Sequence, residues 1–402
     1  MMQGRHITLG ISGSIAAYKA AELARLLIKM GADTEAAMTA NATRFITPLT
    51  FQALTGRPVS CQSFDSSDED VMAHISIAAR TEALVIVPAT ANLIGKMATG
   101  IADDFLTTLC LAVTSPKIIC PAMNVRMFQN PVVQDNLRRL QGFGMTVVMP
   151  GCGDLACGET GTGRLAELPE ILEAIKSALT VKSLAGKKVL VSAGPTREMI
   201  DPVRFISNRS TGKMGFAMAA EAHRRGARVF LVSGPVTTPR PIGVTVVEVT
   251  TAVEMRQAVL DLAQDADVVV KAAAVSDYAP AEQYAQKVKK GLDEQNLRLI
   301  KNPDILAELG RHKGRRLLVG FAAETEDLLA HAREKMIKKN LDLIVANDVS
   351  RPGAGFAVDT NIVKLLYPNG RIDDIPLKSK EEVARDIWDR IVELPAPRGP
   401  IQ

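Results

Sequence analysis

The chain has 402 residues, 47% of them hydrophobic, and a formal net charge of only +4. That length suggests two domains, while five cysteines without paired spacing exclude a disulfide framework, and no apolar run reaches the roughly 18 residues that span a bilayer. One tryptophan, four tyrosines and no dense basic stripe argue against nucleic-acid binding, and an N-terminus without a signal-peptide pattern leads us to expect a cytoplasmic protein.

The first half alternates short β-rich runs with helical stretches. An apolar strand is expected at 7–11, followed by an Ala/Leu-rich helix from about 15 to 30 that ends at Gly31. Further strands are expected at 83–87, 117–120 and 145–149, with helices at 91–113 and 126–140. Such alternation predicts a parallel sheet that is covered by helices on both faces.

The same pattern restarts near residues 180–186, where we place a linker. Strands are expected at 188–192, 228–232, 267–271, 317–321 and 342–346, with helices at 213–225, 252–264 and 326–339. The charged segment 278–302 predicts a flexible loop, and the proline-rich tail 395–402 predicts disorder. The sequence therefore predicts the α/β class, with two doubly wound domains at residues 1–180 and 186–394.

A turn of small residues joins the first expected strand to its helix. It contains Ser12, Gly13, Ser14 and Ile15. Free backbone N–H groups at a helix start, together with two hydroxyls, can bind a phosphate. The turn lacks the G-x-G-x-x-G spacing, so no dinucleotide is implied. Many such turns carry Gly and Ser for geometry alone.

Polar motifs also follow the next two expected strands, where open α/β sheets bind their ligands. Thr90 and Asn92 follow strand 83–87, and Asn124 follows strand 117–120. Each could contact a ligand, or could simply cap the next helix. His6 and His74 are the only histidines of this half of the sequence. A lone histidine such as His74 is more often structural than catalytic, although it could transfer a proton near neutral pH.

Glycines surround Cys157 in the stretch 151–164, which is too broken to predict a helix or a strand. Glycine clusters mark unusual dihedral angles or a close approach to another molecule. A substrate could therefore reach the thiol, and the loop could close over a pocket. The alternative is a surface turn with an incidental cysteine.

In this order, the motifs resemble those of the flavin-dependent cysteine decarboxylases. The matching stretches are 12–19, 38–42, 74–75, 88–92, 121–124 and the loop around Cys157. The resemblance implies a flavodoxin-like or Rossmann-like flavoprotein domain that binds FMN, contacted by Ser12, Gly13, Ser14, Ile15, Thr39, Thr90 and Asn92. It implies 4′-phosphopantothenoylcysteine as the substrate, with His74 acting in oxidative decarboxylation, Asn124 holding the substrate and Cys157 returning a proton. It also implies trimers with FMN sites at subunit contacts, assembled into a dodecamer.

Several motifs of the second half could bind a nucleotide. The run Ser210-Thr211-Gly212 precedes helix 213–225 and could cradle a phosphate, but a Walker A motif is excluded because position 207 is serine. Asp277 puts a carboxylate at the ligand edge of the sheet. Lys287 could stabilise a transferring phosphate or could belong to an ordinary solvated K-x-K-K surface.

This second set resembles phosphopantothenate–cysteine ligase, fused behind the decarboxylase as in bacterial bifunctional enzymes of coenzyme A biosynthesis. The resemblance covers residues from about 5 to 390. It implies a Rossmann-like domain that uses CTP and Mg²⁺ to join cysteine to 4′-phosphopantothenate through an acyl-cytidylate. It also implies that this domain forms dimers, while the residues that bind the metal stay unassigned. Asn208 would bind the acyl-cytidylate near Arg204, and Lys287 would stabilise charge during the transfer. The remaining CTP or substrate contacts would be Ala272, Ala273, Asp277, Pro303, Asp304, Ile305, Leu306, Phe321, Lys335 and Lys339.

One position departs from the family's usual pattern: Thr211 stands where the family usually has serine, and threonine retains the hydroxyl. Surface solubility alone could explain Lys335 and Lys339, which are at i, i+4 spacing. A non-catalytic flavoprotein that regulates partner proteins is the alternative function. The presence of His74, Asn124 and Cys157, with an intact ligase half, favours the bifunctional enzyme.

Overall fold

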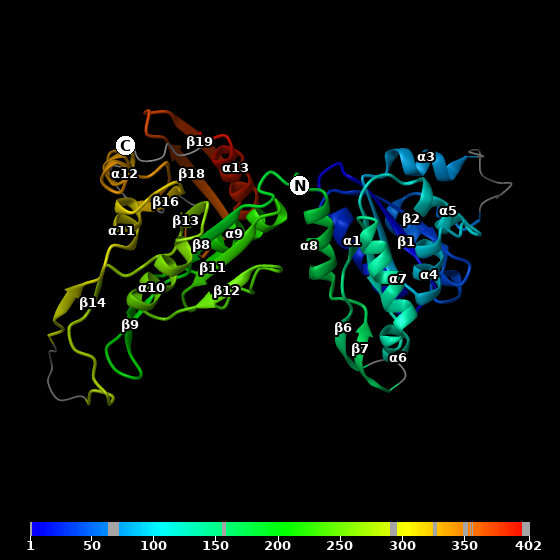
Figure 1. Ribbon diagram of the computed structural model, residues 1–402, viewed down its shortest axis with the longest axis horizontal. Coiled ribbons are helices and arrows are strands. Elements are labelled where there is room, and N and C mark those ends of the chain that lie inside the picture. Colours follow the sequence, from blue (N-terminus) through cyan, green and yellow to red (C-terminus); the bar gives the residue numbers. More distant parts are fainter. Residues whose placement is uncertain are drawn as a thin grey trace. The chain divides into compact units, whose positions relative to one another are not determined.

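The computed structural model describes residues 2–62, 72–154, 158–289, 296–324, 328–348, 353, 355 and 357–395. The chain divides into two compact units, Met1–Thr180 and Val181–Gln402 (Figure 1). Each unit contains a largely parallel sheet with helices packed on both faces, which is the expected α/β class. Within the ranges just given, no helix is long and apolar enough to cross a membrane.

The first unit has a five-stranded parallel sheet in the order β2-β1-β3-β4-β5. Its strands are β1 (His6–Ile11), β2 (Asp33–Met38), β3 (Ala83–Ala89), β4 (Lys117–Pro121) and β5 (Thr146–Val147). Because β2 and β3 lie on opposite sides of β1, the direction of strand addition reverses there. The carboxyl ends of β1 and β3 therefore flank a switch point, where doubly wound sheets bind their ligands.

The helices of this unit differ in part from those expected. They are α1 (Ala17–Lys29), α2 (Pro48–Thr55), α3 (Ala73–Arg80), α4 (Ala91–Thr99), α5 (Phe105–Ala112), α6 (Val125–Gln129), α7 (Pro131–Gly142) and α8 (Leu168–Ala178). Two expected helices of this unit are interrupted, and three of the observed helices, α2, α3 and α8, were not predicted. The expected helix 91–113 is two helices, because Gly100 ends α4 in a left-handed conformation and Asp104 caps α5. The expected helix 126–140 is interrupted where Asn130 caps α7 and Pro131 begins it.

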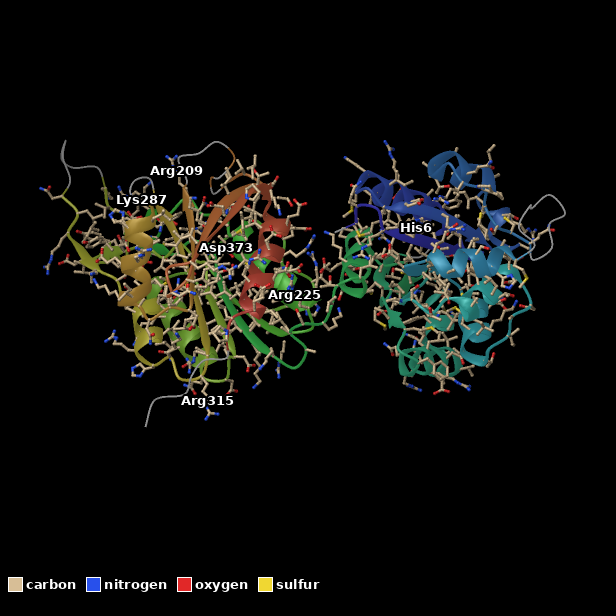
Figure 2. The ribbon with its side chains drawn as sticks, turned by 90° about the horizontal axis from the view of Figure 1, so that it is seen from above. His6, Arg209, Arg225, Lys287, Arg315 and Asp373 are labelled. Atoms are coloured by element: carbon tan, nitrogen blue, oxygen red, sulfur yellow. The ribbon has the colours of Figure 1, made fainter. Side chains whose placement is uncertain are left out.

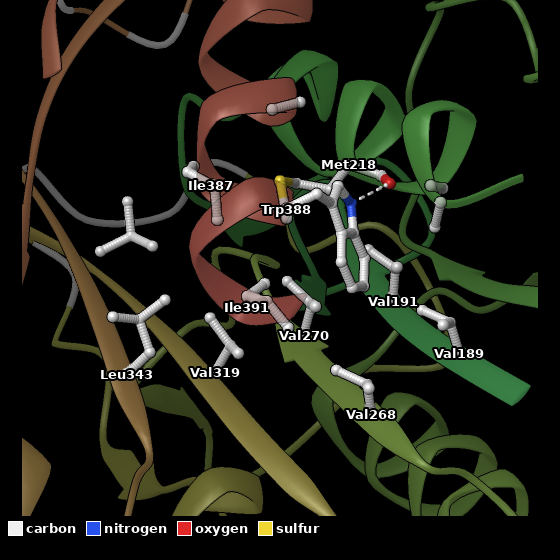
Figure 3. Packing of buried hydrophobic residues seen from close by; sticks show 14 of the residues in the cluster. Val189, Val191, Met218, Val268, Val270, Val319, Leu343, Ile387, Trp388 and Ile391 are labelled. Atoms are coloured by element: carbon white, nitrogen blue, oxygen red, sulfur yellow. Dashed lines mark hydrogen bonds between the residues drawn. The ribbon is translucent and has the colours of Figure 1, made fainter. Parts of the chain in front are cut away.

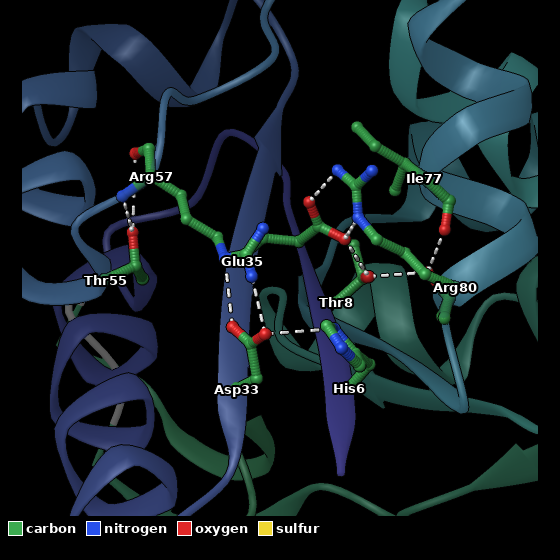
Figure 4. A network of polar contacts seen from close by, with 9 residues as sticks. His6, Thr8, Asp33, Glu35, Thr55, Arg57, Ile77 and Arg80 are labelled. Atoms are coloured by element: carbon green, nitrogen blue, oxygen red, sulfur yellow. Dashed lines mark hydrogen bonds and ion pairs between the residues drawn. The ribbon is translucent and has the colours of Figure 1, made fainter. Parts of the chain in front are cut away.

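A polar network ties the amino ends of β1 and β2 to their neighbours (Figure 4). The buried Glu35 accepts from the Arg80 guanidinium at 2.7 Å and from the Thr8 hydroxyl at 3.2 Å. Asp33 likewise accepts from Arg57 Nε at 2.9 Å. These contacts lie at the strand ends opposite the switch point, so we assign them to stability rather than to the site.

The glycine-rich stretch 151–164 is more ordered than the sequence predicts. It contains an antiparallel hairpin of β6 (Gly151–Asp154) and β7 (Thr160–Arg164). Glycine disfavours strands in isolation, but here Gly161 and Gly163 allow β7 to pack closely on the chain after β4: an added Cβ would meet Val125 at 2.7 Å or the Met123 carbonyl oxygen at 2.2 Å.

The second unit has an eight-stranded sheet in the order β12-β11-β8-β13-β16-β17-β18-β19. The first six strands are parallel, in the strand order of dinucleotide-binding folds, and the last two are antiparallel. The strands are β8 (Lys188–Ala193), β11 (Arg228–Ser233), β12 (Thr245–Glu248), β13 (Val268–Lys271), β16 (Leu317–Glu324), β17 (Leu343–Asp348), β18 (Thr360–Leu366) and β19 (Ile372–Ser379). The switch point lies between β8 and β13.

Two antiparallel ribbons accompany this sheet: β9 (Arg197–Met199) with β10 (Phe205–Ser207), and β14 (Tyr278–Pro280) with β15 (Leu299–Lys301). The second ribbon corrects the expected loop at 278–302, because the two ends of that segment pair with each other. Residues 396–402, for which we expected disorder, lie outside the described residues.

Helices cover both faces of the second sheet. They are α9 (Lys213–Arg224), α10 (Ala252–Ala263), α11 (Ile305–Arg311), α12 (Leu328–Lys338) and α13 (Lys380–Val392). On the face covered by α9 and α13, Trp388 is fully buried among strand valines and donates its indole N–H to the Met218 carbonyl at 2.9 Å (Figure 3). The hydrogen bond satisfies the only polar atom of that side chain.

Candidate functional site

Ser12 joins the two loops that flank the first switch point. It directly follows β1 and is buried; its Oγ donates to the Pro88 carbonyl at 2.7 Å and accepts from the Thr90 N–H at 2.9 Å. The loop after β1 and the end of β3 are therefore held together, although 76 residues separate Ser12 from Pro88.

The turn before α1 leaves backbone donors free. Among the described residues, the N–H groups of Gly13 and Ile15 have no acceptor, whereas that of Ser14 bonds to Ser12 and that of Ala17 to Ser14. An added Cβ on Gly13 would lie 2.6 Å from Asn41 Cβ, so glycine is required for the close approach of the loop after β2. Free N–H groups at a helix start form a site for an anion.

The other predicted flavin contacts lie on neighbouring loops. Thr39 follows β2, and its backbone N–H donates to the Ile11 carbonyl at 3.0 Å. Thr90 caps α4, accepting from the Leu93 N–H at 3.4 Å, so the capping explanation holds for this residue. Asn92 is exposed in the first turn of α4. Ser12, Thr39 and Thr90 thus lie at the carboxyl ends of three adjacent strands.

Asn124 has both ends of its side-chain amide engaged. Oδ1 accepts from the Arg126 N–H at 2.8 Å, and this hydrogen bond caps α6. Nδ2 donates to Glu159 Oε2 at 2.7 Å. Arg126 also pairs with Glu159, at 2.7 Å between Nη2 and Oε1. Since Glu159 immediately precedes β7, the hairpin is fastened to the segment that carries Asn124.

The two remaining catalytic candidates of the first unit are His74 and Cys157. His74 lies half-buried in the first turn of α3, and among the described residues no hydrogen bond joins it to Ser12 or Asn124. Cys157 lies outside the described residues, between β6 and β7. Their roles stay predictions.

In the second unit, a cavity of about 160 Å³ opens at the switch point. Three predicted contacts line it: Ala272, Ala273 and Phe321. Ala272 donates its N–H to the Ser192 carbonyl at 3.1 Å, which fixes the chain after β13 against the end of β8. The remaining wall is the run from Ser210 to Gly215, at the N-terminus of α9, together with Ala274, Ala322, Asn347, Gly355, Asn361 and Lys380.

Three polar side chains of this cavity were missed in the sequence. Asn347 lies at the end of an expected strand, so the criterion that selected Asp277 would have found it. Asn361 and Lys380 belong to β18 and α13, which the periodicity did not predict. Burial and the nearby Lys213 ammonium lower the pKa of Lys380 to about 8, against the opposing effect of Asp359. A partly desolvated ammonium at a cavity wall suits an anionic ligand.

Asn208 and Arg204 are positioned by contacts that reach across the unit. Asn208 Nδ2 donates to the Ala274 carbonyl at 3.0 Å. Arg204 forms a two-point contact with the buried Asp201, which also accepts from the Val288 N–H at 3.3 Å. Although burial raises the pKa of Asp201, hydrogen bonds from the Val203 N–H and from Arg204 and Val288 hold it well below its usual range. Asp201 therefore links Arg204 to the segment that carries Lys287, which is exposed (Figure 2).

A third group of predicted residues surrounds the start of α11. Asp304 caps this helix and pairs with Lys339 Nζ at 3.0 Å. Close by, burial and the Lys339 ammonium lower the pKa of the buried Lys271 to about 7, opposed by Asp304. Pro303 precedes the cap, and Ile305 and Leu306 are buried core residues rather than cavity walls.

The last two predicted contacts have simple surroundings. Asp277 is exposed, and its carbonyl accepts from the Asn302 N–H at 2.8 Å. Lys335 is half-buried on α12, one turn before Lys339. Among the described residues, neither side chain lines the cavity of about 160 Å³.

A larger cavity, of about 630 Å³, lies at the carboxyl ends of β11 and β12, where no site residue was predicted. It shares Ser210 and Thr211 with the smaller cavity. Arg197 and Arg240 contribute to its wall. This volume lies within the range of small-molecule sites.

Two families match the chain. The Flavoprotein family matches residues 1–180, and the DNA/pantothenate metabolism flavoprotein C-terminal domain matches residues 184–394.

Full-length relatives carry both regions. The coenzyme A biosynthesis bifunctional protein CoaBC of Bacillus subtilis (strain 168) is 45% identical over 403 residues, 99% of each chain. The protein of that name from Escherichia coli (strain K12) is 44% identical over 396 residues, 97% of each chain. Among solved structures, the C-terminal domain of a CoaBC protein is 43% identical, covering 53% of this chain and 97% of that chain with a TM-score of 0.46.

Proposed function

The chain belongs to the family of coenzyme A biosynthesis bifunctional proteins, and from this premise we propose how its two units divide the chemistry. The second unit joins cysteine to 4′-phosphopantothenate with CTP. The first unit then removes carbon dioxide from the resulting 4′-phosphopantothenoylcysteine and gives 4′-phosphopantetheine. The product of one unit is thus the substrate of the other.

The residues at the first switch point fit FMN. The free N–H groups of Gly13 and Ile15 would bind its phosphate, and the loops of Thr39 and Thr90 border the same strand ends. When bound, the flavin supplies a two-electron acceptor that is restored within each turnover, so no external oxidant is required. FMN, a mononucleotide, accounts for these contacts without a dinucleotide.

The chain's own groups would then orient the substrate and move its protons. Asn124 presents Nδ2 as a donor for the substrate carboxylate, because its Oδ1 is held by the Arg126 N–H. We assign His74 to proton transfer during the oxidative step and Cys157 to the proton that is returned at the end. A site shared between subunits of a trimer would bring residues of different copies together.

We place CTP at the second switch point, where the cavity of about 160 Å³ would hold part of the nucleotide. The N-terminus of α9 would bind its phosphates, with Lys213 and Lys380 as the nearest ammonium groups. Phe321 and Asn347 would contact the base by stacking and hydrogen bonding. Mg²⁺ would be bound together with the phosphate groups of CTP, because this ion usually binds through substrate phosphates and one or two carboxylates.

The ligation proceeds in two balanced steps. A carboxylate oxygen of 4′-phosphopantothenate attacks the α-phosphorus of CTP and releases pyrophosphate. The amine of cysteine then attacks the acyl carbon, CMP leaves, and the amide loses a proton. Asn208 would hold the acyl-cytidylate beside Ala274, and Lys287 would neutralise charge that develops on phosphate.

The Ser12 contact at the flavodoxin-like switch point carries the assignment of the first unit, and the cavity beside the N-terminus of α9 at the second switch point supports that of the second. The test is an incubation with 4′-phosphopantothenate, cysteine, CTP and Mg²⁺. Release of pyrophosphate and carbon dioxide is expected. Pyrophosphate without carbon dioxide, from a flavin-loaded protein, would favour the regulatory flavoprotein instead. We further propose that the protein is cytoplasmic and that it forms an oligomer with trimers of the decarboxylase unit and dimers of the ligase unit. Mass photometry tests the oligomeric state.

A further inference from the structure

We propose that, before substrate binds, Glu159 occupies the place of the substrate carboxylate on Asn124 and Arg126. Substrate binding then exchanges one carboxylate for the other, and Arg126 becomes a second ligand of the substrate. This inference rests on the proposed decarboxylase function of the first unit.

The contacts of Glu159 match those that a substrate carboxylate requires. One carboxylate oxygen accepts from Asn124 Nδ2 at 2.7 Å, and the other pairs with Arg126 Nη2 at 2.7 Å. The amide of Asn124 cannot be turned around, because its Oδ1 already accepts a backbone N–H at 2.8 Å. The donor side of Asn124 therefore faces a carboxylate in the free protein.

The exchange is inexpensive because the pair is close to water. The Arg126 side chain is 83% exposed and that of Glu159 is 33% exposed. Ion pairs this exposed contribute little to stability. A substrate that is anchored elsewhere by its phosphate would bring its own carboxylate to the same donors, and the charge at the site would stay the same.

The hairpin can remain docked while Glu159 moves. Gly163 accepts from the Met123 N–H at 2.9 Å, and Gly161 packs against Val125. These contacts hold β7 next to the segment 121–126 without the help of Glu159. Only the side chain of Glu159 has to leave.

The experiment compares two substrate analogues that lack the thiol and so cannot be oxidised. They are the amides of 4′-phosphopantothenate with serine, which keeps the carboxylate, and with ethanolamine, which lacks it. Each is titrated into the flavin-loaded full-length protein, and the flavin absorbance is followed, which reports the first unit alone.

In the Glu159→Gln variant the serine amide should bind roughly two- to fivefold more tightly, while the ethanolamine amide binds as before. In the Arg126→Gln variant the binding of the serine amide should weaken by roughly two- to fivefold, again with no change for the ethanolamine amide. Equal shifts for both analogues would mean that Glu159 only fastens the hairpin, and would overturn the proposal. If neither analogue perturbs the flavin of the wild-type protein, the decarboxylase assignment itself fails.

Discussion

Ser12 Oγ lies 2.7 Å from the Pro88 carbonyl oxygen and 2.9 Å from the Thr90 nitrogen, so one hydroxyl closes the gap between two loops of the first switch point. The side chain is 1% exposed, and both of its partners are backbone groups. The hydroxyl thereby sets the distance between the phosphate-binding turn before α1 and the start of α4. Under the proposed function, this geometry would make Ser12 a positioning residue for the flavin.

Replacing Ser12 by alanine should weaken FMN binding. The change leaves the Thr90 N–H without its partner and leaves the Pro88 carbonyl with only the backbone N–H of residue 12, at 3.3 Å, which costs about 1–3 kcal/mol for buried groups. If the cost falls on the bound form, affinity drops roughly five- to one-hundred-fold. A fluorescence titration of FMN into the flavin-free protein measures it. Thr43→Ala, which removes only an exposed local hydrogen bond to Ala40, is the control. An unchanged affinity for Ser12→Ala would contradict this role.

Gly163→Ala should impair decarboxylation, while Gly153→Ala in the same hairpin should be tolerated. Gly163 has φ +154 and an added Cβ would meet the Met123 carbonyl oxygen at 2.2 Å, so β7 must move away from the Asn124 segment. Gly153 has no positive φ, and its nearest added contact is an arginine side chain at 3.7 Å. The rate of carbon dioxide release from supplied 4′-phosphopantothenoylcysteine measures both variants. Equal rates would show that docking of β7 is not needed for catalysis.

Strand and helix alternation predicted the two parallel sheets well, because buried strands read as short apolar runs. The same periodicity could not show the pairing of 151–154 with 160–164, since glycine carries no preference that identifies a strand. It also failed at 91–113, where both helices are rich in apolar residues and the break depends on the conformation of Gly100 and on the cap at Asp104. Local pattern identifies elements, whereas their ends depend on caps.

The candidate sites show a similar division. Polar residues at strand ends, such as Thr90 and Asn124, were found from position alone, because open sheets bind ligands at that edge. Asn361 and Lys380 were missed, because they reach the cavity of about 160 Å³ only through the antiparallel addition of β18 and the packing of α13. The exchangeable partner Glu159 was also missed, since only the folded hairpin brings it to Asn124.

Asn208→Asp should slow ligation without affecting decarboxylation of supplied substrate. The amide donates to the Ala274 carbonyl at 3.0 Å; a carboxylate would face that oxygen as a second acceptor and would also repel an anionic acyl-cytidylate. We expect pyrophosphate release to fall by about tenfold or more. The decarboxylase assay on the same preparation is the internal control. Loss of both activities would indicate misfolding, and full ligase activity would remove the proposed role of Asn208.

Lys271→Met should stabilise the second unit more at low pH than at high pH. Burial and Lys339 lower the pKa of Lys271 to about 7 from the ordinary 10.5. A lysine pKa below its ordinary value means that the charged side chain destabilises the folded state. Below pH 7 both states are protonated and the full penalty, on the order of 4 kcal/mol, is present. Between about pH 7 and 10.5 the folded state releases its proton while the unfolded state keeps it, so stability rises with pH.

The measurement is urea unfolding at pH 6 and pH 9. The fluorescence of Trp388, the single tryptophan of the chain, reports the unfolding of this unit alone. The stability gained by Lys271→Met should be larger at pH 6, whereas Lys338→Met at an exposed position should show no such dependence; an equal gain at both pH values would mean that Lys271 is neutral or well solvated in the folded protein.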